Sequence, residues 1–308
     1  MTTTTTQSAS APPVTTLLDV PGATIAYDVR TSGSTSEPPL LIIGSPMGAS
    51  GFRTLAGLLS DRTIVTYDPR GVDRSTKDDP ATESDPRQHA DDIHRVIQAV
   101  GGPVDVFASS GAAINTLALL ASHPEDVRTL IAHEPPAAAM VPDREAALAA
   151  AEHVAETYQR AGFGLGMAKF ILLVGHQGEI PAGFFDGPDP DPAMFHLPVE
   201  DDGHRTDPLL FQNIRTCTHF EPDFEALAAV KDRLVIAAGE ESEGQLARRG
   251  GEAIAARLGL EPVVFPSGHG GFIGDEYGPG QGGKPVEFAA RLREVLESAG
   301  QSRVARGA

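Results

Sequence analysis

Residues 104 to 113, with the sequence VDVFASSGAA, place a serine at a sharp turn between two apolar stretches. The first stretch has the length of a strand, and an apolar helix pattern begins directly after the turn. This arrangement is typical of a nucleophile elbow, whose common form G-x-S-x-G needs small side chains on both sides of the serine. Ala108 and Ala112 stand in place of the two glycines, so Ser110 is the candidate nucleophile. At a helix N-terminus its hydroxyl would lie beside backbone N–H groups that favour a developing oxyanion.

A histidine late in the chain can supply the base that such a nucleophile needs. His269 stands in the run Pro-Ser-Gly-His-Gly-Gly, directly after an apolar strand pattern. Glycines on both sides let the imidazole approach a serine without steric hindrance and accept its proton. The other nine histidines show no metal-ligand spacing such as H-E-x-x-H. We therefore expect acid–base chemistry at a nucleophilic serine, with no metal and no cofactor.

Short strand patterns alternate with helix patterns along most of the chain. The strand patterns cover residues 17–20, 23–30, 40–43, 63–67, 104–108, 127–132, 233–238 and 262–265. The helix patterns cover residues 88–100, 245–258, 285–298 and the segment after Ser110. This alternation predicts an α/β fold with a doubly wound, mostly parallel sheet that begins with an antiparallel hairpin. Ligands gather at the carboxyl ends of parallel strands, where Ser110 and His269 both stand.

The alternation stops between residues 136 and 231. A helical pattern over 147–158 and an apolar stretch over 162–174 precede a run rich in Pro, Gly and Asp over 181–208. We expect a helical insertion that covers the sheet edge as a cap and keeps water out of a pocket. The expected organisation is a disordered tail (1–14), an α/β core (15–135 and 232–300), the cap (136–231) and a frayed tail (301–308).

The composition excludes several classes of partner. The chain of 308 residues has a formal net charge of −18, which disfavours nucleic acid and anionic membranes. Apolar residues make up 41% and charged residues 21%, as in an ordinary globular protein. No apolar run reaches membrane-spanning length and the Thr-rich start lacks the features of a signal peptide, so we expect a cytoplasmic protein. The single cysteine, Cys217, excludes an internal disulfide.

Four features, taken in order, resemble the α/β-hydrolase fold. They are the glycine and proline loop at Gly44, the Asp-Pro-Arg-Gly turn at Asp68, the turn at Ser110 and the late His269. The resemblance covers the chain from about residue 15 to residue 300. Serine members of this fold hydrolyse substrates through an acyl-enzyme. The resemblance therefore implies that Ser110 attacks an ester-type carbonyl while His269 accepts its proton.

The resemblance also implies an oxyanion hole built from backbone N–H groups. One donor would be Gly111, the residue after the nucleophile. The other would come from the loop at residues 44–48, where an ungapped comparison indicates Ser45 and a shifted one indicates Met47.

The resemblance places the acid that orients the histidine at one of two positions. In most relatives it follows the strand at 233–238, three residues beyond the glycine; here that position is Ser242, with Glu240 and Glu241 just before it. In others it ends the strand after the nucleophile, about 24 residues further on, where Glu134 stands before two prolines that would hold it rigidly. We favour Glu134 as the acid and keep Glu241 as the alternative.

These features favour a serine hydrolase of the carboxylesterase or lactonase type. Its expected partner is a small apolar ester or lactone, and the formation of a homodimer is left open. The alternatives are a cofactor-free lyase, a C–C hydrolase or haloperoxidase-like relative, and a non-catalytic ligand-binding member of the same fold. Dehalogenase and epoxide hydrolase chemistry is disfavoured, because those enzymes carry Asp rather than Ser at the turn.

Overall fold

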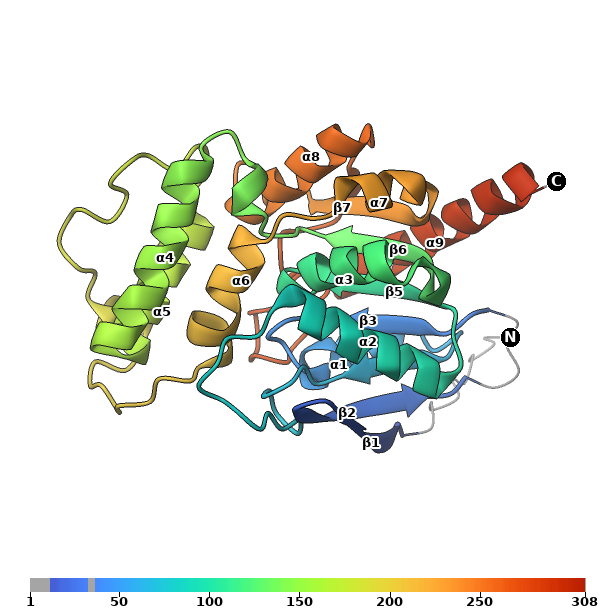
Figure 1. Cartoon of the computed structure of the whole chain (residues 1–308), viewed down its shortest axis with the longest axis horizontal. Coiled ribbons are helices and arrows are strands. Elements are labelled where there is room, and N and C mark those ends of the chain that lie inside the picture. Colours follow the sequence, from blue (N-terminus) through green and yellow to red (C-terminus); the bar gives the residue numbers. More distant parts are fainter. Residues whose placement is uncertain (1–11, 33–36, 308) are drawn as a thin grey trace, which may run out of the picture.

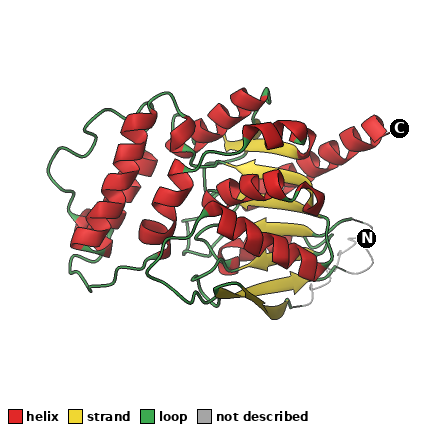
Figure 2. Cartoon of the chain, in the orientation of Figure 1, coloured by secondary structure: helices red, strands yellow, loops and turns green. Residues whose placement is uncertain are grey.

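A central sheet organises the computed structural model, which describes residues 12–32 and 37–307. The strands are β1 (Val14–Val20), β2 (Ala23–Arg30), β3 (Leu40–Ile43), β4 (Ile64–Tyr67), β5 (Val104–Ser109), β6 (Val127–His133), β7 (Leu234–Gly239) and β8 (Val263–Phe265). They lie in the order β1-β2-β4-β3-β5-β6-β7-β8. The β1–β2 and β2–β4 pairs are antiparallel and all later pairs are parallel. The predicted mostly parallel sheet with an initial hairpin is confirmed (Figure 2).

Helices cover both faces of the sheet (Figure 1). They are α1 (Arg53–Leu58), α2 (Pro86–Val100), α3 (Gly111–Ser122), α4 (Arg144–Ala161), α5 (Phe163–Gly175), α6 (Ile214–His219), α7 (Phe224–Ala229), α8 (Leu246–Leu258) and α9 (Pro285–Gly307). Apolar side chains of α2, α3 and α8 pack on one face of the sheet. Those of α1 and α9 pack on the other face. The sheet is therefore doubly wound, as predicted.

The insertion between β6 and β7 stands away from the sheet. Helices α4 and α5 lie beyond one end of the sheet, opposite the end where the chain termini lie (Figure 1). Together with α6 and a π-helical turn, η5 (Pro208–Asn213), they surround a separate apolar cluster that includes Val154, Tyr158 and Leu210. Because this cluster buries its own apolar surface, the insertion forms a packed helical body.

Two predicted boundaries differ from the structure. Helix α7 lies before residue 231 and thus inside the predicted insertion. However, its residue Leu227 packs in the apolar cluster on the face of the sheet that α2, α3 and α8 cover. The helices that stand away from the sheet therefore end at α6. Helix α9 continues to Gly307 instead of ending at Ser298, because the glycine at position 300 costs only about 1 kcal/mol in a helix. Residues 1–11 of the predicted disordered tail lie outside the described residues, and β1 begins at Val14.

No helix in the described ranges combines the length and the apolar character needed to cross a membrane.

A buried ion pair joins the loop after β4 to α2. The guanidinium of Arg70 donates from Nε to Oδ2 of Asp92 over 2.7 Å and from Nη2 to Oδ1 over 2.6 Å. Both side chains are shielded from water. Burial raises the pKa of Asp92, although the contact with Arg70 acts in the opposite direction. Removing one partner would leave the other charge buried without compensation.

We expect Asp92→Ala to lower the free energy of unfolding by about 3–5 kcal/mol for this reason. The matched control is Asp91→Ala, which removes the neighbouring pair with Arg95 on the exposed side of the same helix and should cost under about 1 kcal/mol. Urea unfolding followed by circular dichroism measures both values. Similar losses in the two variants would contradict the assigned role of the buried pair.

Candidate active site

Ser110 occupies a strained position between β5 and α3. Its backbone has φ 61° and ψ −128°, a conformation that residues other than glycine rarely adopt. The turn is held by its neighbours, because the Ser110 N–H donates to the carbonyl of His133 and the Ala113 N–H donates to the carbonyl of Ser110, both over 2.9 Å. Ser110 therefore stands at the N-terminus of the twelve-residue helix α3.

Gly111 lies against the loop that follows β3. A Cβ atom at this position would be 2.6 Å from the carbonyl oxygen of Ser45 and 3.2 Å from Sγ of Cys217, so no side chain fits without a backbone shift. This close approach brings the loop at Ser45 beside the first turn of α3. Ser45 itself is buried, and its Oγ donates to Oδ1 of Asn213 over 3.0 Å.

Met47 points in another direction. Its side chain packs against the apolar cluster around Phe52, and a Cβ atom on Gly44 would lie 2.7 Å from the Cβ of Met47. The backbone of Ser45 lies beside Gly111, and the choice between the N–H groups of Ser45 and Met47 as second oxyanion donor stays a prediction.

Glu134 and His269 come together although 135 positions separate them in the chain. Glu134 follows β6 directly, has φ 47° and is completely buried. Its Oε2 lies 2.6 Å from Nδ1 of His269, and its Oε1 accepts the N–H of Gly239 over 2.8 Å. Because the carboxylate can only accept, Nδ1 carries the proton and Nε2 of His269 is left as an acceptor.

The surroundings of Glu134 keep its carboxyl group ionised. Burial by itself would raise the pKa, since it penalises the charged form. The hydrogen bond with His269, the charges of His133 and His269 and the N–H of Gly239 outweigh this effect and lower the pKa to about 2. The imidazole of His269 therefore faces a carboxylate, which favours its protonated form during proton transfer.

The alternative acid lies elsewhere. Glu241 is half-exposed, and its carboxylate accepts from Nζ of Lys284 over 2.7 Å and from the hydroxyl of Ser267 over 3.3 Å. Glu240 accepts from the same lysine over 3.1 Å. The structure thus brings Glu134, and not Glu241, to His269.

His133 is a neighbour of the site that we did not identify from the sequence. It is fully buried, and its ring lies 6.0 Å from that of His269 and close to Phe107 and Phe288. Burial lowers the pKa of His133 to about 4. The charge of Glu134 acts to raise this pKa, and that of His269 acts to lower it. The signal in the sequence was its position as the last residue of a buried strand, directly before Glu134.

Ser110 and His269 line the same cavity, whose volume is about 350 Å³. The helical insertion contributes apolar side chains such as Phe170 and Leu209, and no Asp, Glu, Lys or Arg of the described residues lines the cavity. Cys217, to which the sequence analysis assigned no role in the site, also lines it, and burial raises the pKa of its thiol to about 12. The site therefore suits an uncharged molecule.

Two groups in the described chain have the residue types and proximity to hold a metal ion. One is His133, Glu134 and His269, and the other is His94, His123 and Asp126. In the first group both oxygens of Glu134 and Nδ1 of His133 already have protein partners. That arrangement fixes the direction of a proton and suits acid–base chemistry.

The pKa of His133 predicts how stability depends on pH. The unfolded chain binds a proton at this histidine near pH 6.5, while the folded chain does so only near pH 4, so stability falls as the pH drops between these values. We expect His133→Phe to reduce this loss by up to about 3 kcal/mol. Buried His89, whose pKa is lowered to about 3 by the same cause, should maintain part of the dependence of unfolding free energy on pH.

Urea unfolding at pH 7 and at pH 4.5 tests this expectation. The control is His204→Gln, which changes an exposed histidine and should leave the difference in unfolding free energy between the two pH values unaltered. An identical difference in His133→Phe and in the unmodified protein would show that His133 is not buried in its neutral form.

Comparisons with known proteins agree with this fold, although no protein-family model matches the chain. An uncharacterized hydrolase of Bacillus subtilis, YraK, is 29% identical over 295 residues, which cover 91% of this chain and 95% of the relative. Two solved structures share the fold. A thermophilic esterase from Thermogutta terrifontis has a TM-score of 0.64 and 18% identity, and the match covers 94% of this chain and 99% of the esterase. A putative epoxide hydrolase from Pseudomonas aeruginosa has a TM-score of 0.62 and 16% identity, and the match covers 94% of this chain and 97% of that protein. The strand order, the alternating helices and these likenesses together show that this chain belongs to the α/β-hydrolase fold.

Proposed function

We propose that this protein is a serine hydrolase that cleaves an ester or lactone of an apolar molecule through an acyl-enzyme. The observation that carries the proposal is the hydrogen bond between Glu134 and His269, together with the strained backbone of Ser110. His269 and Ser110 open onto one uncharged cavity. The hydrolase of Bacillus subtilis and the esterase of Thermogutta terrifontis, by their names, support the same class of reaction.

In the proposed reaction, Nε2 of His269 takes the proton from Oγ of Ser110 as that oxygen attacks the substrate carbonyl carbon. The imidazole is then positively charged, and the ionised carboxylate of Glu134 stabilises it through Nδ1. When the tetrahedral intermediate collapses, His269 donates the proton to the leaving alkoxide. A water molecule then attacks the acyl-enzyme while His269 accepts its proton. His269 returns this proton to Oγ of Ser110, and the carboxylic acid product is released.

The negative charge of the intermediate develops on the former carbonyl oxygen. The backbone N–H of Gly111, at the first turn of α3, is the proposed first donor to this oxygen. The proposed second donor comes from the loop that carries Ser45, because this loop packs directly against Gly111. The helices α4 to α6 form the proposed cap, which keeps water from competing with these hydrogen bonds.

Ser110→Ala should abolish turnover of activated esters, because the variant lacks the attacking oxygen. The fold should persist, since only one hydroxyl is removed. A fluorophosphonate probe, which reacts with activated serines, should add once to the unmodified protein and not to the variant. Intact mass spectrometry measures the adduct. Labelling of a folded Ser110→Ala protein would rule out this nucleophile.

Glu134→Gln should lower turnover by at least about 100-fold, because the amide no longer stabilises a charged imidazole. Glu241→Gln serves as the matched control and should stay within about twofold, since that carboxylate pairs with Lys284 on the surface. Steady-state kinetics on one ester give both values. Equal losses in the two variants would refute the assignment of the acid.

The position of Ser242 offers a rescue of the same variant. Ser242 is fully buried, its Oγ has no hydrogen-bond partner, and it lies next to Gly268, the residue before His269. We expect the double variant Glu134→Gln with Ser242→Asp to turn over at least about tenfold faster than Glu134→Gln alone, because a second carboxylate becomes available to the imidazole of His269. A folded double variant no faster than Glu134→Gln would show that position 242 does not reach His269.

A further inference from the structure

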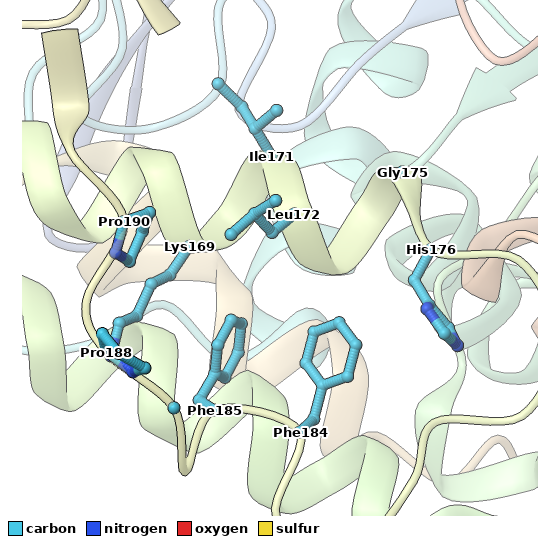
Figure 3. A pocket seen from close by; sticks show the side chains of 10 residues that line it. Lys169, Ile171, Leu172, Gly175, His176, Phe184, Phe185, Pro188 and Pro190 are labelled. Atoms are coloured by element: carbon cyan, nitrogen blue, oxygen red, sulfur yellow. The ribbon is translucent and has the colours of Figure 1, made fainter. Parts of the chain in front are cut away.

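Helix α5 separates the cavity that contains Ser110 from a second cavity on its outer side. The outer cavity has a volume of about 410 Å³ and lies between α5 and the loop that follows it (Figure 3). Phe184 and Phe185 stand side by side in this loop and face the helix (Figure 3). Ile171 and Gly175 line both cavities. The linings of the two cavities therefore share residues in the C-terminal part of α5.

The exposed surface of α5 is unusual for a helix at the outside of a protein. Lys169 is its only charged residue, so the helix is apolar on every face. Nevertheless Ile171, Leu172 and Val174 are 36%, 40% and 40% exposed. Apolar side chains on this scale at the protein surface usually mark a place where an apolar ligand or partner binds.

The lysine that lines the outer cavity already has partners. Nζ of Lys169 lies 2.6 Å from Nε2 of His153 and 2.6 Å from Oδ1 of Asp189, and it stands over the ring of Phe185. The lysine side chain is itself buried. The charge of Lys169 is thus compensated within the protein, and Nε2 of His176, which also lines the outer cavity, lies 3.0 Å from the carbonyl oxygen of Glu179. Both groups of the described lining that can be positively charged therefore already have protein partners. The remaining lining favours an uncharged apolar occupant.

Gly175 leaves space where the linings of the two cavities share residues. It is the last residue of α5, and a Cβ atom placed on it would have no atom within 4 Å. A side chain there would thus enter empty space. Gly175 is exposed, so the absence of a side chain leaves open space at a position that lines both cavities.

We propose that the substrate is an ester with a long, uncharged acyl chain, and that this chain passes Gly175 from the cavity at Ser110 into the outer cavity. The inference rests on the proposed function and names its substrate class. The carbonyl lies at Ser110, the first part of the chain contacts the apolar lining from the cap, and the distal part lies against Leu172, Phe184 and Phe185. Each methylene buried in this way increases affinity about fourfold.

A chain-length series of 4-nitrophenyl esters tests the proposal. We compare kcat/KM for the decanoate and the butanoate in the unmodified protein, in Gly175→Phe and in Gly175→Ala. The decanoate-to-butanoate ratio should fall at least about tenfold in Gly175→Phe, because the ring closes the route to the outer cavity. Gly175→Ala is the matched control for the backbone and should keep the ratio. An unchanged ratio in Gly175→Phe would overturn the proposal.

A second variant tests the outer cavity without altering the cavity at Ser110. Leu172 lines only the outer cavity, and Leu172→Asp should lower the same ratio at least about tenfold because a carboxylate opposes an apolar chain. Val199→Asp, at an exposed position that lines neither cavity, is the control and should leave the ratio unchanged. A ratio unaffected by Leu172→Asp would place the chain elsewhere and would overturn the proposal.

Binding to an inactive protein separates this inference from the proposed function. If the unmodified protein hydrolyses no ester of the series, the proposed function fails, and calorimetric titration of Ser110→Ala with octan-1-ol still tests the route. Octan-1-ol should bind Ser110→Ala at least about tenfold more tightly than it binds Ser110→Ala with Gly175→Phe. Equal affinities would overturn the inference whatever the activity.

Discussion

The buried carboxylate of Glu134 connects the strand ends that form the site. It follows β6, accepts the N–H of Gly239 at the end of β7, and binds Nδ1 of His269 beyond β8. A charge removed from water is tolerated only where hydrogen bonds and opposite charge compensate it. Both oxygens of Glu134 have such partners, so the carboxylate stays ionised and the direction of the imidazole is set. The loops after three neighbouring strands therefore depend on one side chain.

A second constraint acts on the opposite side of the site. The first turn of α3 lies so close to the loop after β3 that only glycine fits at position 111. Asn213, from the cap, accepts the hydroxyl of Ser45 in this loop and also lies within hydrogen-bond distance of Cys217. The proposed cap thus does more than cover the site, because one of its side chains binds the loop on which the proposed oxyanion hole depends. Polar groups buried in this way also require an exact partner, which favours one arrangement of the cap.

Much of the fold followed from local patterns in the sequence. Apolar runs such as residues 40–43 correspond to strands within one residue at each end, because a strand buried on both faces has little freedom in composition. The exception is β1, which is mostly exposed and begins three residues before the predicted run at 17–20. The ends of the cap were less accurate. Residues 224–229 lie within the predicted insertion, but Leu227 packs in the apolar cluster on one face of the sheet. This burial could not be inferred from helical periodicity, which gives the apolar face of a helix and not the surface that this face contacts.

The sequence by itself determined the layers of the fold, the serine at a strand-to-helix turn and the histidine in a glycine-rich loop, since these depend on residues adjacent in the chain. It left the acid open between Glu134 and Glu241, because that choice depends on which carboxylate meets an imidazole from a distant loop. Only the tertiary structure directed Glu134 inward to His269 and Glu241 outward to Lys284. It alone also revealed the burial of His133 and the cavity behind α5. The physical reason is that side-chain direction and enclosed space arise when separate strands and helices pack together, and no local pattern encodes them.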